Sequence, residues 1–307
     1  MTIHCITPNP AVDITYRVDD LAVHAVNRVR EVTRRPGGKG VNVARLLAAR
    51  GLPAATYGFL GGGTGNQLVD LLEALQPALP QRWTFTGADT RLTIAVVDGQ
   101  DTTMFNEPGR PVTAGDWDGL AATVAEHCRP SDVVTISGSL PTGAEPERLA
   151  DLVRAARDAG GTVIADTSGA GLIAAARAGA QLLKPNHHEL LEATAAPDLA
   201  TGIRQLLDAG SQAVVVSQGA EGILLGTPTA TYHAGLGQQL TGNPTGAGDA
   251  LVAALAAAIA AGPDAPLVDA LPSAVGWSAA AVLSPVAGEL DQATADQLTH
   301  DVTIKEL

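Results

Sequence analysis

The chain of 307 residues carries a formal net charge of −13, and charged and aromatic residues make up only 17% and 3% of its sequence. This acidic, aromatic-poor composition argues against a nucleic-acid partner, which requires clustered cations and stacking rings. The length suffices for one large α/β domain with a sizeable core.

The cysteine count and the apolar runs bear on the cellular compartment. Cys5 and Cys128 are too few for a disulfide framework or a structural zinc site, so both are predicted to be reduced thiols of a cytoplasmic protein. The most apolar run, residues 250–261, is shorter than the roughly 20 residues that a membrane span needs. The N-terminus lacks a basic segment followed by an apolar one, so no targeting segment and no membrane association are predicted.

The first third of the chain contains several strand patterns without helices between them. Residues 2–7 read as a short buried strand that ends at Pro8, and residues 12–18 and 27–33 alternate between apolar and polar side chains. Residues 91–98 and 102–106 alternate in the same way and are joined through Gly99, which predicts a hairpin. We expect the last four strands to form a small sheet that stands off the main domain.

A glycine loop at residues 36–40, Pro-Gly-Gly-Lys-Gly, precedes a predicted helix in which Val43 and Leu47 recur at helical spacing. It is not a Walker P-loop, because Gly40 follows Lys39 where that motif needs Ser or Thr. From these residues alone, a flexible turn with a solvated lysine remains the alternative.

A further glycine cluster lies at residues 58–65. A dinucleotide-binding fingerprint starting from Gly61 and Gly63 would need a third glycine where Asn66 stands. The cluster is therefore interpreted as a loop leading into a helix over residues 67–75.

From residue 116 onward, predicted helices alternate with short apolar strands. The helices cover residues 116–128, 145–159, 170–177 and 199–209, and the strands cover residues 133–136, 162–166, 181–184 and 213–217. This order predicts a mostly parallel sheet with helices on both faces. In such sheets ligands bind beyond the carboxyl ends of the strands. Those ends carry Ser-Gly-Ser at 137–139, Asp-Thr-Ser at 166–168, Lys-Pro-Asn at 184–186 and Ser-Gln-Gly at 217–219.

A later apolar helix is predicted over residues 265–283 and is interrupted at Pro272.

The stretch 242–262 combines a glycine loop with an alanine-rich helix that must begin near Gly248. Free amides at a helix start attract an anion such as a phosphate, and Gly246 and Gly248 allow it to approach closely. Asp249 would lie beside that phosphate, where a carboxylate can activate an alcohol. The alternative is that Asp249 is an ordinary first-turn residue and that the glycines only shape a turn.

Five motifs taken together resemble the PfkB carbohydrate kinase family, on the branch of 1-phosphofructokinases and tagatose-6-phosphate kinases. They are Gly37-Gly38-Lys39-Gly40-x-Asn42, Ser137-Gly138-Ser139-Leu140-Pro141, Asp166-Thr167-Ser168-Gly169, Lys184-Pro185-Asn186-x-x-Glu189 and Gly246-Ala247-Gly248-Asp249. The resemblance runs from the first strand to the helix after Asp249. It implies a single ribokinase-like α/β domain over residues 1–307, with a mostly parallel central sheet flanked by helices. A β-sheet lid would be formed from about residues 12–33 and 91–106.

The resemblance also implies residue roles. Asp249 resembles the base that deprotonates the acceptor hydroxyl, and Gly246, Ala247 and Gly248 resemble the anion hole. Asp13, Gly37, Gly38, Asn42 and Ser137 resemble substrate contacts, and Arg28, Lys39 and Arg91 resemble cations for a substrate phosphate. Lys184, Asn186, Ser217 and Gly219 resemble nucleotide contacts together with Gly246 and Gly248. Asn186 and Glu189 would place Mg²⁺ through water.

The sequence departs from the branch at three places. Met104 stands where the family has Glu, Pro244-Thr245 replaces Thr-Val, and Gln218 replaces an apolar residue. None of these changes removes a group that phosphoryl transfer needs, but they could shift the preferred sugar.

The resemblance predicts an ATP- and Mg²⁺-dependent kinase that converts fructose 1-phosphate to fructose 1,6-bisphosphate. Tagatose-6-phosphate or fructose-6-phosphate kinase activity is the alternative within this class, and a non-catalytic sugar-phosphate-binding regulator is the alternative outside it. The expected partner is a small-molecule sugar phosphate, and a homodimer through the lid is an arrangement that the family allows.

Overall fold

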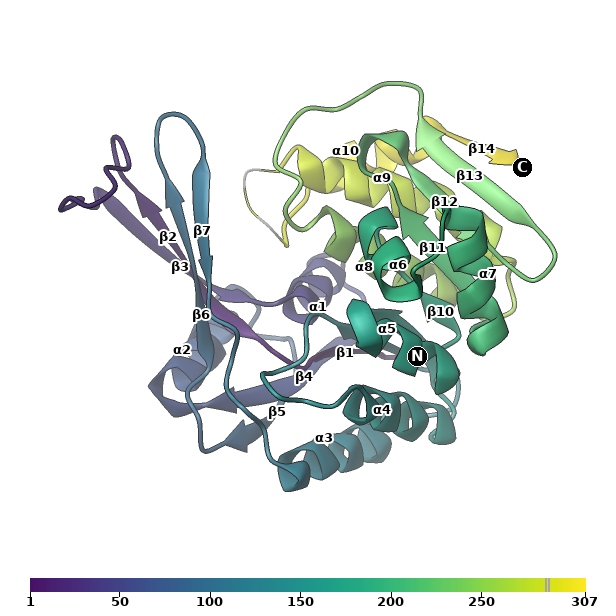
Figure 1. The fold of residues 1–307 in the computed structure, drawn as a ribbon, viewed down its shortest axis with the longest axis horizontal. Coiled ribbons are helices and arrows are strands. Elements are labelled where there is room, and N and C mark those ends of the chain that lie inside the picture. The colour runs from purple at the N-terminus through teal and green to yellow at the C-terminus, as the bar shows by residue number, and fades with distance from the viewer. Residues whose placement is uncertain (285, 287) are drawn as a thin grey trace.

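Two β-sheets with flanking helices make up the fold in the computed structural model, which describes residues 1–284, 286 and 288–307 (Figure 1). The large sheet has ten strands in the order β14-β13-β12-β11-β10-β9-β8-β1-β4-β5. Its strands are β1 (Ile3–Thr7), β4 (Ala54–Gly61), β5 (Gln81–Thr86), β8 (Val133–Ser137), β9 (Thr162–Asp166), β10 (Leu182–Leu183), β11 (Ala213–Ser217), β12 (Ile223–Gly226), β13 (Thr231–Leu236) and β14 (Val302–Glu306).

Pairing from β5 to β11 is parallel throughout, and only β12, β13 and β14 add antiparallel strands at one edge. The central strands β1, β8 and β9 are almost entirely buried, as expected for strands that helices cover on both faces. The mostly parallel sheet predicted from the sequence is thus confirmed, and the carboxyl ends of its strands lie along one edge.

Helices cover both faces of this sheet. Side chains of α1, α8, α9 and α10 pack in one apolar core, and those of α3, α4, α5 and α7 pack in a second core on the other face. The helices are α1 (Lys39–Ala49), α2 (Gly62–Leu75), α3 (Ala114–His127), α4 (Pro146–Asp158), α5 (Gly169–Arg177), α6 (His187–Thr194), α7 (Leu199–Ala209), α8 (Ala247–Ala261), α9 (Leu271–Val282) and α10 (Gln292–His300).

The small sheet stands off the large one and has the order β3-β2-β6-β7 (Figure 1). Its strands are β2 (Ala11–Arg17), β3 (Glu31–Gly37), β6 (Arg91–Val97) and β7 (Thr102–Asn106). Its apolar face packs against α2 through a third core that contains Val12, Ile14 and Leu68. The predicted four-stranded sheet and its hairpin are confirmed.

One strand of the small sheet begins later than predicted. The sequence pattern suggested a strand over residues 27–33, whereas β3 pairs with β2 only from Glu31 to Gly37. Asn27 instead closes the preceding loop, because its side chain accepts from the amide of Ala22 at 2.8 Å and donates to the same residue's carbonyl.

The glycine cluster at residues 58–65 is not a loop, so this prediction is wrong. Residues 58–61 belong to β4 and residues 62–65 form the first turn of α2. Gly58 has a φ of 152°, and a Cβ there would lie 2.1 Å from the carbonyl oxygen of Thr7 on the neighbouring strand. The glycine is needed for close strand pairing and not for a turn.

The predicted helix over residues 265–283 is divided in the structure. A short 3-10 turn, Leu267–Ala270, leads into α9, and Pro272 lies in the first turn of that helix. A proline is tolerated there because the amide it lacks has no acceptor within the helix. Among the described residues, no helix is both long and apolar enough to cross a membrane.

Candidate active site

A cavity of about 750 Å³ lies beyond the carboxyl ends of β10 and β11, between α6 and the start of α8. Many of the site residues predicted from the sequence line it. These are Lys39, Lys184, Asn186, Glu189, Ser217, Gly219, Gly246, Ala247, Gly248 and Asp249. They come from loops and helix ends that are far apart in the sequence. The fold therefore brings into one cavity residues that belong to separate sequence motifs.

The start of α8 lines the site. Gly246 precedes the helix in a left-handed conformation, with a φ of 86°, which favours glycine. The amide of Ala250 is bonded to the carbonyl of Gly246 at 2.9 Å, so the earlier amides have no acceptor within the helix. The amide of Ala247 already donates to the carbonyl of Pro244 at 3.2 Å. The amides of Gly248 and Asp249 are therefore the better donors for an anion.

Asp249 is the central acid of the site and is only 5% exposed. Asn42 of α1 donates its side-chain amide to Oδ2 of Asp249 at 2.8 Å. Burial, followed by the negative charge of Asp166, raises the pKa of Asp249 to about 7, while the Asn42 bond and the charges of Lys39 and Lys184 act in the opposite direction. A carboxylate with this pKa can exchange a proton near neutral pH.

Asp166, at the end of β9, joins two lysines. Its Oδ1 lies 3.2 Å from Nζ of Lys184 and 3.4 Å from Nζ of Lys39. Its Oδ2 is buried and has no hydrogen-bond partner among the described residues. The sequence placed Asp166 at a strand end but assigned it no role. The signal that could have singled it out was an acid at the carboxyl end of a central parallel strand.

Lys39 is held among carboxylates. Besides Asp166, its Nζ lies 3.9 Å from Oε1 of Glu189. The charge of Asp166 is the main reason that the pKa of Lys39 is raised, with smaller contributions from Glu189 and Asp249. The ammonium group is therefore charged and faces the cavity.

Asn186 and Glu189 form a reciprocal cap at the start of α6. Oδ1 of Asn186 accepts from the amide of Glu189, and Oε2 of Glu189 accepts from the amide of Asn186, both at 2.8 Å. Oε1 of Glu189 stays directed toward Lys39. This oxygen and the partnerless Oδ2 of Asp166 are the carboxylate atoms that fit a hard cation such as Mg²⁺.

A second group of predicted residues surrounds the base of the small sheet. Burial raises the pKa of Asp13 on β2 to about 6, although the charge of Arg91 and a bond from Thr93 lower it. A Cβ on Gly37 would lie 2.2 Å from the Asp13 carboxylate, so only glycine fits beside it. The adjacent Gly38 has a φ of 112°, which a residue with a side chain rarely adopts.

Arg91 is fixed by the residues around it. Its guanidinium donates to the carbonyl of Asn9 from Nε and to the carbonyl of Glu107 from Nη1, both at 3.1 Å. It lines a separate small pocket with Asn9 and Gly109. Ser137, at the end of β8, is fully buried, and its hydroxyl lacks a hydrogen-bond partner among the described residues.

Several of the predicted substrate residues do not line the large cavity. Asp13, Gly37, Gly38, Asn42, Arg91 and Ser137 lie outside its lining. Asn42 is nevertheless linked to it by the bond to Asp249. Arg28 lies in the exposed loop between β2 and β3, away from the strand on which it was expected. Within a single chain, the three predicted phosphate-binding cations are therefore not gathered in one pocket.

Comparison with known proteins gives a consistent result. Residues 7–293 match the family described as pfkB family carbohydrate kinase. The chain is 32% identical to 1-phosphofructokinase of Bacillus subtilis (strain 168) over 264 residues, which cover 84% of this chain and 85% of the relative. It is 37% identical to 1-phosphofructokinase of Xanthomonas campestris pv. campestris over 267 residues, 83% of each chain. Among solved structures, phosphofructokinase-2 from Escherichia coli in complex with potassium superposes with a TM-score of 0.90 at 27% identity, covering 97% of this chain and 98% of the other.

Proposed function

Since the chain belongs to the pfkB family of carbohydrate kinases, we propose that it phosphorylates a ketohexose monophosphate and that fructose 1-phosphate, converted to fructose 1,6-bisphosphate, is its substrate. Family membership makes the chain a phosphotransferase that acts on a sugar hydroxyl, and sugar kinases of this family use ATP. The substrate, the catalytic base and the anion hole are the proposed parts.

The observation that carries the proposal is the environment of Asp249. Its carboxylate is buried, is held through Oδ2 by Asn42 at 2.8 Å, and faces the cavity beside the glycine loop. The second oxygen of Asp249 is then available to accept a proton from a sugar hydroxyl. Because its pKa is raised to about 7, the ionised form is basic enough for this step and still populated near neutral pH.

The transferred phosphoryl group needs positioning and charge neutralisation more than covalent chemistry. The amides of Gly248 and Asp249 at the start of α8 supply donors at the positive end of the helix dipole. Lys184 and Lys39 supply two ammonium groups around Asp166. Ser217 and Gly219, which line the same cavity, lie where the rest of the nucleotide would bind.

A magnesium ion would be held by Glu189 and Asp166 on the side of the nucleotide phosphates, with Asn186 acting through water. When bound, it would neutralise negative charge on those phosphates. The protein's own part is to fix the two carboxylates: the Asn186 cap orients Glu189, and the two lysines orient Asp166.

The phosphate already present on the sugar is proposed to meet Arg91, Lys39 and Arg28, in addition to hydroxyl contacts from Asp13, Asn42, Ser137 and the backbone of Gly37 and Gly38. The bonds that hold Arg91 in place favour a fixed grip on an anion. Solved structures of Escherichia coli phosphofructokinase-2 include a complex with fructose-6-phosphate. Fructose 6-phosphate and tagatose 6-phosphate are therefore the rival substrates.

ADP release measured with fructose 1-phosphate, fructose 6-phosphate and tagatose 6-phosphate tests the substrate. We expect the highest kcat/KM for fructose 1-phosphate. A higher value for either 6-phosphate would overturn fructose 1-phosphate as the substrate but would leave the proposed kinase activity standing. ADP release with none of the three would favour the non-catalytic regulator, which is disfavoured because Asp249, Lys39, Asn186 and Glu189 are all retained.

The role of Asp249 is tested by Asp249→Asn, which keeps the shape of the side chain but removes the base. Turnover should fall by roughly 10²–10⁴-fold while ATP binding, measured by calorimetry, changes little. Asp208→Asn, on the exposed face of α7, is the matched control and should keep normal turnover. Normal turnover by Asp249→Asn would show that another group accepts the proton.

A further inference from the structure

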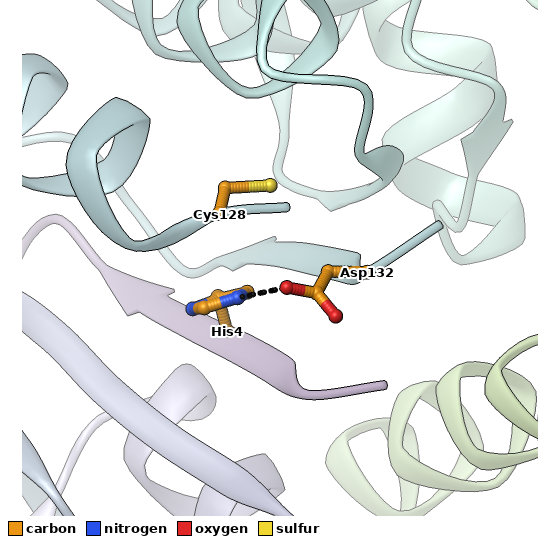
Figure 2. Close-up of side chains that lie close together, drawn as sticks. All are labelled: His4, Cys128 and Asp132. Carbon is orange, nitrogen blue, oxygen red and sulfur yellow. Dashed lines mark hydrogen bonds and ion pairs between the residues drawn. The ribbon is translucent and has the colours of Figure 1, made fainter. Parts of the chain in front are cut away.

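A second cluster of reactive side chains lies at the opposite end of the sheet from the cavity, near the amino ends of β1 and β8 (Figure 2). His4 belongs to β1, Cys128 directly follows α3, and Asp132 immediately precedes β8. All three residues are buried, and none takes part in the proposed phosphoryl transfer. Their ligand atoms, one nitrogen, one sulfur and one oxygen, lie within 4.8 Å of one another.

We propose that His4, Cys128 and Asp132 form a binding site for a divalent transition-metal ion of the zinc type. Imidazole, thiolate and carboxylate are the three side-chain ligands that such ions take, and a water molecule would complete a tetrahedron. The count of two cysteines argued against a structural zinc site, but this donor set needs only one of them.

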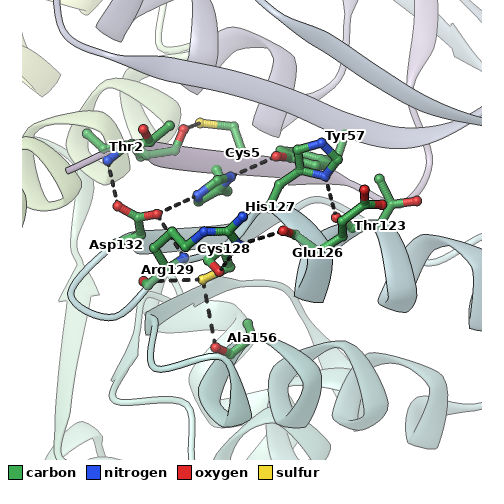
Figure 3. Close-up of polar contacts among 12 residues, drawn as sticks. Thr2, Cys5, Tyr57, Thr123, Glu126, His127, Cys128, Arg129, Asp132 and Ala156 are labelled. Carbon is green, nitrogen blue, oxygen red and sulfur yellow. Dashed lines mark hydrogen bonds and ion pairs between the residues drawn. The ribbon is translucent and has the colours of Figure 1, made fainter.

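The surroundings hold two of the ligands in place. The Asp132 carboxylate accepts from the amide of Thr2 at 2.7 Å and from the amide of Arg129 at 3.0 Å (Figure 3). The Nδ1 atom of His4 lies 2.8 Å from the hydroxyl of Tyr57, and its Nε2 lies 3.1 Å from Oδ2 of Asp132. The Thr2 bond to Oδ1 of Asp132 and the Tyr57 bond to Nδ1 of His4 reach the atoms that would face away from the ion, and such contacts are typical of metal sites because they fix the orientation of the carboxylate and the ring.

Cys128 is the least constrained of the three. Its sulfur makes only long contacts, at 3.8 Å to the carbonyl of Arg129 and 3.9 Å to the carbonyl of Ala156. Ligand atoms around one tetrahedral ion are about 3.4–3.7 Å apart, given metal–ligand distances of about 2.0–2.3 Å. Because the three ligand atoms all lie within 4.8 Å of one another, no pair needs to close by more than about 1.4 Å to reach that separation.

Charge balance favours a divalent ion. Binding would release the thiol proton of Cys128 and would replace the bond between Nε2 of His4 and Oδ2 of Asp132, so the ring proton of His4 would move from Nε2 to Nδ1, where the oxygen of Tyr57 accepts it. One thiolate and one carboxylate then carry two negative charges against the two positive charges of the ion. A neutral buried group of this kind is much less costly than an unpaired buried charge.

The test uses the full-length protein after treatment with a chelator, with Co²⁺ as the spectroscopic probe. We expect a sulfur-to-cobalt charge-transfer band that saturates at one ion per chain and is lost on addition of Zn²⁺. Magnesium-type sites built from oxygen ligands, such as the one proposed at Glu189, cannot give this band. Wild-type protein without the band would overturn the proposal.

Cys5→Ala and Cys128→Ala are matched variants, because Cys5 and Cys128 are the two buried thiols of the chain. The band should persist in Cys5→Ala and vanish in Cys128→Ala, with folding checked by circular dichroism. A band that survives in Cys128→Ala would overturn the proposal. If Cys128→Ala does not fold, X-ray absorption spectroscopy of the zinc-loaded wild type tests the site instead. One sulfur atom in the zinc coordination sphere would support the site, and a coordination sphere without sulfur would exclude it.

Discussion

At the scale of single residues, the site depends on one buried acid that can hold its proton up to near neutral pH. Asp249 must be ionised to accept a proton from a sugar, so kcat/KM should rise with pH through the pKa of the free enzyme, about 7. The bond from Asn42 stabilises the ionised form and lowers that pKa. The two side chains thus set the working pH range together.

Asn42→Ala tests this coupling. Without the amide donor the pKa of Asp249 should rise further, which moves the acid limb of the kcat/KM profile to higher pH. The measurement is the pH profile of kcat/KM, because loss of a sugar contact alone would lower the rate without moving the limb. Ser137→Ala is the control, since it removes a proposed substrate contact and leaves Asn42 in place. An unchanged limb in Asn42→Ala would contradict the coupling.

Asp249 should also lower the stability of the folded protein at alkaline pH. Its pKa is raised from 3.8 to about 7 on folding, so between these values the folded chain binds more protons than the unfolded chain. Stability then falls as pH rises through this window. At pH 8, Asp249→Asn should be the more stable protein by on the order of 2 kcal/mol, or about 3 °C in Tm for a chain of this length.

Thermal unfolding of wild type and Asp249→Asn at pH 8 and near pH 4 checks this expectation. The difference in Tm should be present at pH 8 and much smaller near pH 4, where the folded chain holds the proton and the unfolded chain, with a pKa of 3.8, is about half protonated. A variant less stable than wild type at pH 8 would mean that the ionised carboxylate is stabilised by Lys39, Lys184 and Asn42 more than burial destabilises it.

Residue-level prediction reached its limit at Asp166. The motifs gave Asp249, Lys39, Lys184, Asn186 and Glu189 through a family resemblance, and the fold brings these residues to one cavity. The meeting of two lysines at one carboxylate depends on side chains from three separate strand or helix ends, which spacing along the chain does not reveal. Arg28 lies in a loop and not on the predicted strand, because β3 begins at Glu31, a few residues later than the sequence pattern indicates.

At the scale of elements, α1 shows how a glycine allows a helix to approach a strand. A Cβ on Gly40 would lie 2.5 Å from Oγ1 of Thr7 and 2.6 Å from the carbonyl oxygen of Ile6. The helix can therefore pack directly on β1 only with glycine at this position. Because α1 also carries Lys39 and Asn42, its position determines the geometry of the site.

Gly40→Ala should push α1 away from β1 and destabilise the protein by about 1–3 kcal/mol. The KM for the sugar phosphate should rise because Asn42 moves with the helix. Gly63→Ala is the matched control: Gly63 is likewise the second residue of its helix, α2, but a Cβ there would meet no atom within 4 Å. That variant should gain up to about 1 kcal/mol. Equal Tm values for the two variants would contradict the packing argument.

Prediction of elements from sequence worked where apolar periodicity was uninterrupted. The alternating helices and strands from residue 116 to β11 (Ala213–Ser217) agree with the structure to within a few residues. It failed where glycines lie in a buried strand, as in β4, where a strand is very short, as in β12, and where strands are largely half-buried or exposed, as in β5, β13 and β14. Helix α6 was missed because its start is defined by a cap between Asn186 and Glu189 rather than by an apolar stripe.

At the scale of the whole molecule, the small sheet is tied to the rest of the chain at two places. Its apolar face packs on α2, and Arg35 of β3 is bonded to Glu289, whose Oε1 also lies 3.1 Å from Nη2 of Arg45 on α1. We therefore expect the two sheets to behave as a single domain, in which the small sheet acts as the lid over the sugar. This arrangement leaves the outer part of the small sheet exposed.

That exposed part is the surface most suited to a second copy of the chain. Exposed apolar side chains lie on the two edge strands of the small sheet, β3 and β7, and on the loop between β2 and β3: Val23, Val26, Val29, Val32, Met104 and Phe105. Several large exposed apolar groups on one small element commonly mark an interface. We expect this chain to form at least a homodimer through the lid.

Phe105→Asp tests the lid interface against a matched variant, Phe85→Asp. Phe105 is 56% exposed on β7 of the small sheet, and Phe85 is 57% exposed on β5, at the edge of the large sheet. A buried interface cannot accept an unpaired carboxylate without a large desolvation cost, so Phe105→Asp should shift the mass measured by light scattering toward the monomer. Phe85→Asp should keep the mass of the wild type. A monomeric wild type, or dissociation only in Phe85→Asp, would contradict a dimer formed through the lid.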